Sequence, residues 1–232
     1  MSAVTLSPWQ TPPDRPELDR RQVHLWRFRL TLAGAERTRL KSLLSAAELA
    51  RADRLLDAAK ADQFIVARIR LRQILGRYLD LPPAEILFDY GKHGKPGLAA
   101  GITAELEFNL AHAGSRGLLA VSAAAALGVD IEWIDPQLEY GKIAAQFFTP
   151  DEVEALKLTA AGRQRRAFYR TWTRKEAWLK GQGGGFSSPQ FQQPGAGWSI
   201  RSFTVGRDYL GAVACAGSPS GILRWDFDWP QT

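Results

Sequence analysis

Two stretches of the sequence match each other without a gap at a constant offset of 104 residues. Each begins with a hydrophobic pair and a Ser/Thr-x-x-Glu capping box, at Ser45–Glu48 and at Thr149–Glu152. This box marks the start of a helix, and Pro150 fits the first helical position because no N–H is needed there. The register continues through hydrophobic positions, Phe64 with Phe168 and Leu75 with Leu179.

The repeat predicts that one arrangement of elements occurs twice. In each copy a capped helix leads into a longer amphipathic helix, and a strand-like run follows at 117–122 and at 209–214. We predict an α+β fold of two similar halves related by a pseudo-twofold axis, each a small antiparallel sheet packed with helices. The expected halves are 1–123 and 124–232. The alternative is a chance match, since amphipathic helices resemble one another.

Composition excludes several classes of protein. The chain has 232 residues, 45% of them hydrophobic and 23% charged, which suits a globular protein with a real core. A single cysteine, Cys215, excludes an internal disulfide framework, and three scattered histidines make a structural zinc site improbable. There is no apolar run of about 20 residues, as a membrane span needs. The proline-rich start does not resemble a signal peptide. We therefore expect a cytoplasmic protein with no membrane partner.

The formal net charge of +6 favours an anionic ligand or an acidic partner. Nucleic acid is the alternative from another class, because eight tryptophans accompany the basic charge. The aromatic residues lie at core spacing, and no nucleic-acid-binding motif is present. We therefore expect no nucleic acid partner.

The segment 127–134 alternates like a strand. Val129 and Ile131 fall on one face, and Asp130 and Glu132 fall on the other. Two carboxylates this close repel unless a cation or a basic group offsets them. The alternative is a solvent-facing edge strand with ordinary surface acids.

The segment 168–180 has helical spacing and places Glu176 and Lys180 on one face as an i,i+4 pair. The alternative is an ordinary surface pair. The aligned positions in the first copy are Arg72 and Gly76, so the chemistry differs between the copies. A strand that offers Asp130 and Glu132 together with a helix that offers Glu176 would suit Mg²⁺, and Lys180 would neutralise charge on a phosphate oxygen.

Two further residues have spacing and surroundings typical of a phosphate site. His112 follows a strand-like run at a predicted turn, and Lys95 lies in a Gly-Lys-Pro loop within a predicted hairpin over 90–97. The alternatives are a structural turn histidine and a solvated loop lysine. The glycines at 181, 183 and 184 should end the long helix directly after Lys180.

These segments, in this order, resemble the surfactin-synthetase-activating (group II) type of 4′-phosphopantetheinyl transferase. The resemblance spans positions from about 45 to 185. The segments that carry it are Gly94-Lys95-Pro96, Phe108-Asn109-Leu110-Ala111-His112-Ala113-Gly114, Gly128-Val129-Asp130-Ile131-Glu132 and Trp172-Thr173-Arg174-Lys175-Glu176-Ala177-Trp178-Leu179-Lys180.

The resemblance implies an enzyme that moves phosphopantetheine from coenzyme A to a serine of an apo acyl or peptidyl carrier protein and releases 3′,5′-ADP. It implies Mg²⁺ on Asp130, Glu132 and Glu176, with Glu176 also as general base and Lys180 as a catalytic cation. The coenzyme A-binding residues that it implies are Lys95, His112, Asn109 and Arg68, with Arg72 beside Arg68 near the 3′-phosphate. Since the second half supplies the partner surface, we expect a monomer.

Two positions depart from the family pattern. Ala111 stands where a serine is common, which predicts a modest loss of coenzyme A affinity, and Gln63 stands where an arginine is common. The alternative function is a catalytically impaired relative that binds carrier proteins and coenzyme A as a scaffold. The acids and Lys180 argue against that alternative.

Overall fold

The computed structural model describes residues 5–91, 94–102, 104–184 and 195–228. The strands are β1 (Thr5–Gln10), β2 (Gln22–Arg29), β3 (Phe88–Tyr90), β4 (Pro96–Leu98), β5 (Glu107–Ala113), β6 (Arg116–Ser122), β7 (Leu127–Trp133), β8 (Trp198–Gly206), β9 (Tyr209–Ala216) and β10 (Gly221–Asp226). The helices are α1 (Gly34–Leu40), α2 (Ala46–Asp53), α3 (Ala58–Leu79), α4 (Tyr140–Phe147), α5 (Pro150–Leu158) and α6 (Ala161–Gly181).

The duplication predicted from the sequence is present in the topology. In the first half, β2 is followed by three α-helices, by the short β3–β4 pair and then by the β5–β6 hairpin. In the second half, β7 is followed by three helices and then by the β8–β9 hairpin. The strand orders β2-β6-β5 and β7-β9-β8 correspond element by element. The predicted α+β fold of two similar halves is confirmed.

The capping boxes predicted from the sequence are also formed. The side chain of Ser45 accepts a hydrogen bond from the backbone N–H of Glu48 at the start of α2, and the Glu48 side chain accepts from Ser45 N. Thr149 and Glu152 make the same reciprocal pair at the start of α5. Each box therefore fixes the short helix that precedes the long one in its half.

The first sheet differs from the small antiparallel sheet that was expected. Strand β10 lies between β1 and β2 and runs parallel to both, which gives the order β1-β10-β2-β6-β5. Residues 221–226 lie within the range predicted for the second half, yet they belong to the sheet of the first half. Alternation within a single strand carries no information on which sheet that strand joins.

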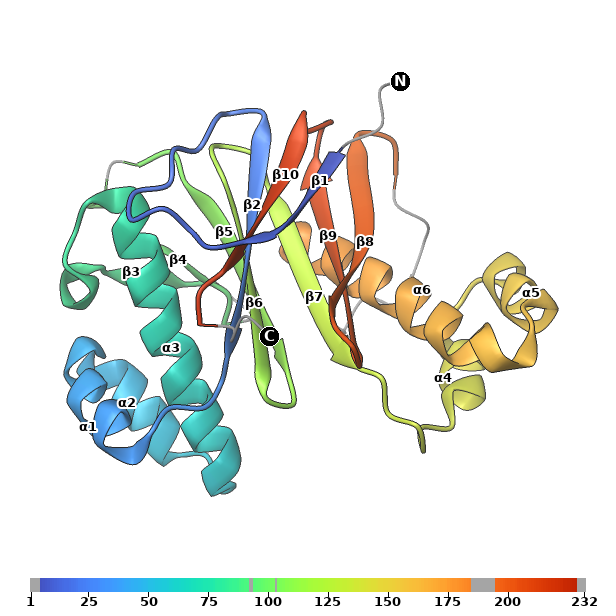
Figure 1. Cartoon of the computed structure of the whole chain (residues 1–232), viewed down its shortest axis with the longest axis horizontal. Coiled ribbons are helices and arrows are strands. Elements are labelled where there is room, and N and C mark those ends of the chain that lie inside the picture. Colours follow the sequence, from blue (N-terminus) through green and yellow to red (C-terminus); the bar gives the residue numbers. More distant parts are fainter. Residues whose placement is uncertain (1–4, 92–93, 103, 185–194, 229–232) are drawn as a thin grey trace.

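The two sheets face each other and a long helix covers the outer side of each (Figure 1). Buried residues of both sheets fill the space between them, including Leu25 and Leu118 from the first and Val129 and Val213 from the second. α3 packs on the other face of the first sheet and α6 on the other face of the second. No helix of the described residues is both long and apolar enough to cross a membrane.

Candidate active site

Strand β7 carries the acidic pair at the edge of the second sheet. Val129 and Ile131 are buried between the two sheets, so the alternation turns Asp130 and Glu132 toward the face that α6 covers. Only 4% of Asp130 is exposed. The alternative of a solvent-facing edge strand is therefore wrong for Asp130, whose carboxylate lies at the buried contact between β7 and α6.

Gly128 explains why strand and helix come so close. A Cβ at this position would lie 2.1 Å from Ala177 O and 2.2 Å from Gly181 N. The absence of a side chain therefore lets the β7 backbone rest directly on the last turns of α6. Any larger residue would push α6, and with it Glu176, away from Asp130.

The last turns of α6 bring Glu176 and Lys180 to this contact. Lys180 Nζ lies 2.5 Å from Asp130 Oδ1, so the lysine pairs across to β7 and the alternative of an ordinary surface pair is wrong. The helix ends as predicted, because Gly183 has φ +74° and the N–H groups of Gly183 and Gly184 donate to Lys180 O and Leu179 O.

Burial raises the pKa of Asp130, Glu132 and Glu176, and like charges add to the rise at Glu132 and Glu176. The pKa of Glu176 rises to about 7, chiefly because the side chain is buried and then because Asp130 and Glu132 lie nearby, with Lys180 opposing the rise. The pKa of Glu132 also rises to about 7, through burial and the charge of Asp130, and Trp172 Nε1 donates to its Oε1 at 3.2 Å. Burial opposes the charge on Lys180, but Asp130 raises the pKa of that ammonium above its ordinary value.

A cavity of about 320 Å³ adjoins this acidic contact. Its described lining contains no acidic residue, and Lys180 is both part of that lining and the partner of Asp130. Of the residues implied for coenzyme A binding, all but Arg72 line it, namely Arg68, Lys95, Asn109 and His112. The fold thus gathers residues from α3, from the loop before β4 and from β5 around the end of α6.

Arg68 and Arg51 flank the ring of Phe64 at one side of the cavity. The two guanidinium carbons lie 5.2 Å and 5.4 Å from the ring centroid. Arg68 is only 6% exposed, and its Nη1 has no hydrogen-bond partner in the described structure. A buried donor without a partner suits an anionic ligand. Arg51 was missed in the sequence because α2 shows only its capping box and no phosphate-binding motif.

Lys95 and Asn109 also make contacts within the protein. Lys95 Nζ lies 3.4 Å from Lys180 O, at the end of α6. Asn109 Oδ1 accepts a hydrogen bond of 2.8 Å from Val129 N, which joins β5 of the first sheet to β7 of the second. Asn109 therefore aligns the two halves at the cavity, a contact that the sequence pattern did not indicate.

The expectation for Arg72 is wrong, and Gln63 lies away from the cavity. Arg72 does not reach the cavity, since it is buried and its guanidinium group binds Glu48 and the carbonyl oxygens of Pro83 and Ile86. Gln63 lines a different, smaller cavity of about 240 Å³ beside Arg37. Arg51 and Arg68 provide the cations that Gln63 lacks.

Comparison with known proteins identifies the family of this chain. The model of the 4′-phosphopantetheinyl transferase superfamily matches residues 126–214, from just before β7 into β9. The 4′-phosphopantetheinyl transferase HetI of Nostoc sp. (strain PCC 7120) is 33% identical over 222 residues, which cover 90% of this chain and 94% of that protein. The chain belongs to the 4′-phosphopantetheinyl transferase superfamily.

Two other members of the superfamily match shorter stretches. A 4′-phosphopantetheinyl transferase of Bacillus subtilis is 28% identical over 158 residues, 68% of each chain. The 4′-phosphopantetheinyl transferase AcpT of Salmonella typhi is 38% identical over 113 residues, 49% of this chain and 56% of that protein. The match to HetI covers 90% of the chain, so the chain is similar to a transferase over both of its halves.

The acidic contact has the chemistry of a divalent-cation site for this enzyme family. Asp130 Oδ2 and Glu176 Oε1 are buried and have no hydrogen-bond partner among the described residues, and carboxylate oxygens are the ligands that Mg²⁺ prefers. Among the described residues, the three predicted carboxylates do not form a cluster that could hold a metal ion by themselves. Asp130 is neutralised by Lys180 instead. Asp130 and Glu176 therefore fit a cation, with Glu132 next to them on β7.

Proposed function

We propose that this protein transfers 4′-phosphopantetheine from coenzyme A to a serine of an apo carrier protein, as a transferase of the surfactin-synthetase-activating type. The first half would supply most of the coenzyme A cavity, and the second half would supply the acids. One observation carries the proposal. Lys180 lines the cationic cavity and also forms an ion pair with Asp130. A diphosphate bound in the cavity would therefore lie next to the buried carboxylates.

The reaction assigns a role to each group. The serine Oγ attacks the phosphorus atom next to the pantetheine arm, the new O–P bond forms, and the bond to 3′,5′-ADP breaks. Glu176 accepts the serine proton, since a pKa of about 7 suits a general base near neutral pH. Lys180 neutralises charge on the departing phosphate.

The remaining cations hold the substrate. Arg51, Arg68 and Lys95 would hold the phosphate groups of coenzyme A in the cavity. Mg²⁺ on Asp130 and Glu176, with Glu132 beside them, would offset charge on the diphosphate.

Intact mass spectrometry of an apo carrier protein tests the proposal. We expect the carrier to gain the mass of one phosphopantetheine group when it is incubated with this protein, coenzyme A and Mg²⁺. The gain should disappear when EDTA is added. Binding of coenzyme A without a mass gain on any acyl or peptidyl carrier would contradict transfer and favour the scaffold alternative.

The pKa of His112 leads to a prediction of how coenzyme A binding depends on pH. Partial loss of water around the ring, and then the charges of Lys180 and Arg68, lower the pKa of His112 below its ordinary 6.5, so the free imidazole is neutral at pH 7. A bound phosphate favours the charged imidazole and raises this pKa. The affinity should therefore increase as pH falls below 7, by about tenfold for each unit by which binding raises the pKa.

The measurement is calorimetric titration of coenzyme A between pH 6 and 8 in two buffers of different ionisation enthalpy, which also reports the proton uptake. The phosphate groups of coenzyme A titrate in the same range, so His112→Gln is the control that isolates the histidine. Equal pH dependence in the two proteins would contradict this role.

Ala111 does not face the ligand. It is buried in the core between the sheets, and it is not part of the cavity lining. The expected loss of coenzyme A affinity from a missing hydroxyl at this position is therefore not supported. Ala111→Ser would bury a hydroxyl among apolar side chains and should lower the free energy of unfolding by about 1–3 kcal/mol without lowering the KM for coenzyme A. Urea denaturation measures the change in the free energy of unfolding, and steady-state kinetics measures the KM for coenzyme A.

A further inference from the structure

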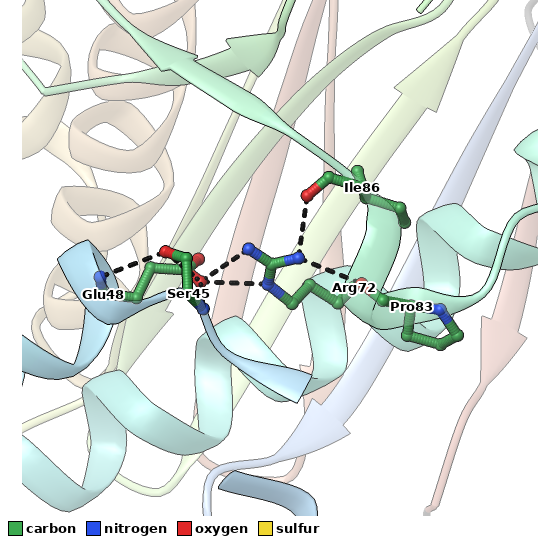
Figure 2. Close-up of polar contacts among 5 residues, drawn as sticks. All are labelled: Ser45, Glu48, Arg72, Pro83 and Ile86. Atoms are coloured by element: carbon green, nitrogen blue, oxygen red, sulfur yellow. Dashed lines mark hydrogen bonds and ion pairs between the residues drawn. The ribbon is translucent and has the colours of Figure 1, made fainter. Parts of the chain in front are cut away.

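In both halves an ion pair with a buried cation ties the short capped helix to the long helix. In the first half the capping glutamate Glu48 accepts from two guanidinium nitrogens of Arg72 on α3, at 3.0 Å and 2.7 Å (Figure 2). The same guanidinium group donates to Pro83 O at 3.0 Å and to Ile86 O at 2.8 Å. Arg72 therefore holds α2, α3 and the segment after α3 together.

The second half contains the equivalent tie. The capping glutamate Glu152 lies 2.9 Å from Lys175 Nζ on α6, and the Lys175 side chain is 3% exposed. The ammonium group also lies 5.9 Å from the centre of the Phe148 ring, just before the N-cap of α5. Lys175 thus joins α6 to the start of α5 in the way that Arg72 joins α3 to the start of α2.

The two ties differ by one residue in register. Glu48 and Glu152 are related by the constant offset, but the position aligned with Arg72 is Glu176 and not Lys175. One residue is about 100° of rotation around a helix. The anchor of α6 therefore points toward α5, while the next residue, Glu176, points toward Asp130 of β7.

We infer that Lys175 is a positioning residue, whose buried ion pair with Glu152 holds α6 in the rotation that aims Glu176 at the reacting serine. The inference rests on the proposed function for its kinetic readout. It makes Lys175 a residue that touches neither coenzyme A nor the carrier protein, since the residue faces α5 and is not part of the cavity lining.

The test removes both charges of the tie at once. In the double variant Glu152→Gln with Lys175→Met no buried charge is left without a partner, so much of the stability that a single substitution removes should return. We expect kcat to fall about 10- to 100-fold, because a small misplacement of the base is enough for such a loss. The Kd for coenzyme A should stay within about threefold of the wild type, because neither Glu152 nor Lys175 lines the cationic cavity.

The first half offers a matched control. The double variant Glu48→Gln with Arg72→Met removes the equivalent ion pair, which is also buried, from a helix that carries no base. We expect this control to keep kcat within about threefold of the wild type, even if its Tm falls as much as that of the second-half double variant. An equal loss of kcat in the two double variants, or an unchanged kcat in the second-half variant, would overturn the inference.

Amide hydrogen exchange separates this inference from the proposed function. Faster exchange over residues 176–181 is expected in the second-half double variant and not in the first-half control, whether or not any carrier is modified. Unchanged exchange there would overturn the inference. A wild-type protein that loads no carrier would contradict the proposed function and leave the exchange result to decide on Lys175.

Discussion

Glu176→Gln should lower the rate of carrier modification by roughly 10³-fold. Glutamine has the shape of glutamate but cannot accept the serine proton. The carboxylate is buried, its Oε1 lacks a partner among the described residues, and its pKa is raised to about 7 by burial and by its acidic neighbours. Because the substitution removes a buried like charge, the Tm should stay the same or rise. Single-turnover mass spectrometry of the carrier gives the rate, and thermal denaturation gives the Tm.

The binding of coenzyme A separates loss of chemistry from loss of the site. Measured without Mg²⁺, the Kd of the Glu176→Gln variant should stay near the wild-type value, since Arg68 and Lys95 are untouched. Glu154→Gln, at an exposed position on α5, is the matched control and should keep full activity. A Glu176→Gln variant that retains more than a tenth of the wild-type rate would rule out Glu176 as the base.

Arg72→Met should be the most damaging single substitution for stability, at about 3–5 kcal/mol. Glu48 is 1% exposed and would lose its ion pair with Arg72 (Figure 2). Two backbone carbonyl groups, of Pro83 and Ile86, would lose their donor as well. For a chain of this length the corresponding fall in Tm is about 10 °C.

Denaturation by urea measures this effect, and Lys142→Met provides the contrast. Lys142 pairs with Glu139 on the surface, where the two side chains are 81% and 73% exposed. An exposed pair contributes little, so this variant should unfold at nearly the wild-type urea concentration. A similarly small change for Arg72→Met would show that the buried pair is not a major source of stability.

The sequence predicted the local structure of this enzyme well. The capping boxes at Ser45 and Thr149 are local hydrogen-bonding patterns, so they needed no knowledge of the rest of the fold. The alternation over 127–133 separated Val129 and Ile131 from Asp130 and Glu132, because the period of a strand is fixed by covalent geometry. The offset of 104 residues gave the duplicated topology, since similar patterns fold into similar elements.

Contacts between distant segments were not available from such patterns. Arg72 and Arg68 are four residues apart on one helix, and the sequence could not tell that one binds Glu48 while the other faces the cavity. Arg51 lines the cavity because α2 packs beside α3, and no local pattern in the sequence shows that packing. Ala111 was read as a missing ligand, but the pleat of β5 turns it into the core.

The position of β10 has a consequence for how the chain is made. Its residues pair with those of β2 about 200 positions earlier, as Ile222 does with Val23, and Asp228 reaches Arg70 at 2.8 Å. The first sheet therefore stays incomplete until residues 221–226 have been synthesised, because β10 lies between β1 and β2. We expect the two halves to unfold in one cooperative transition, and a chain shortened before residue 221 to expose the edge of β2 to aggregation.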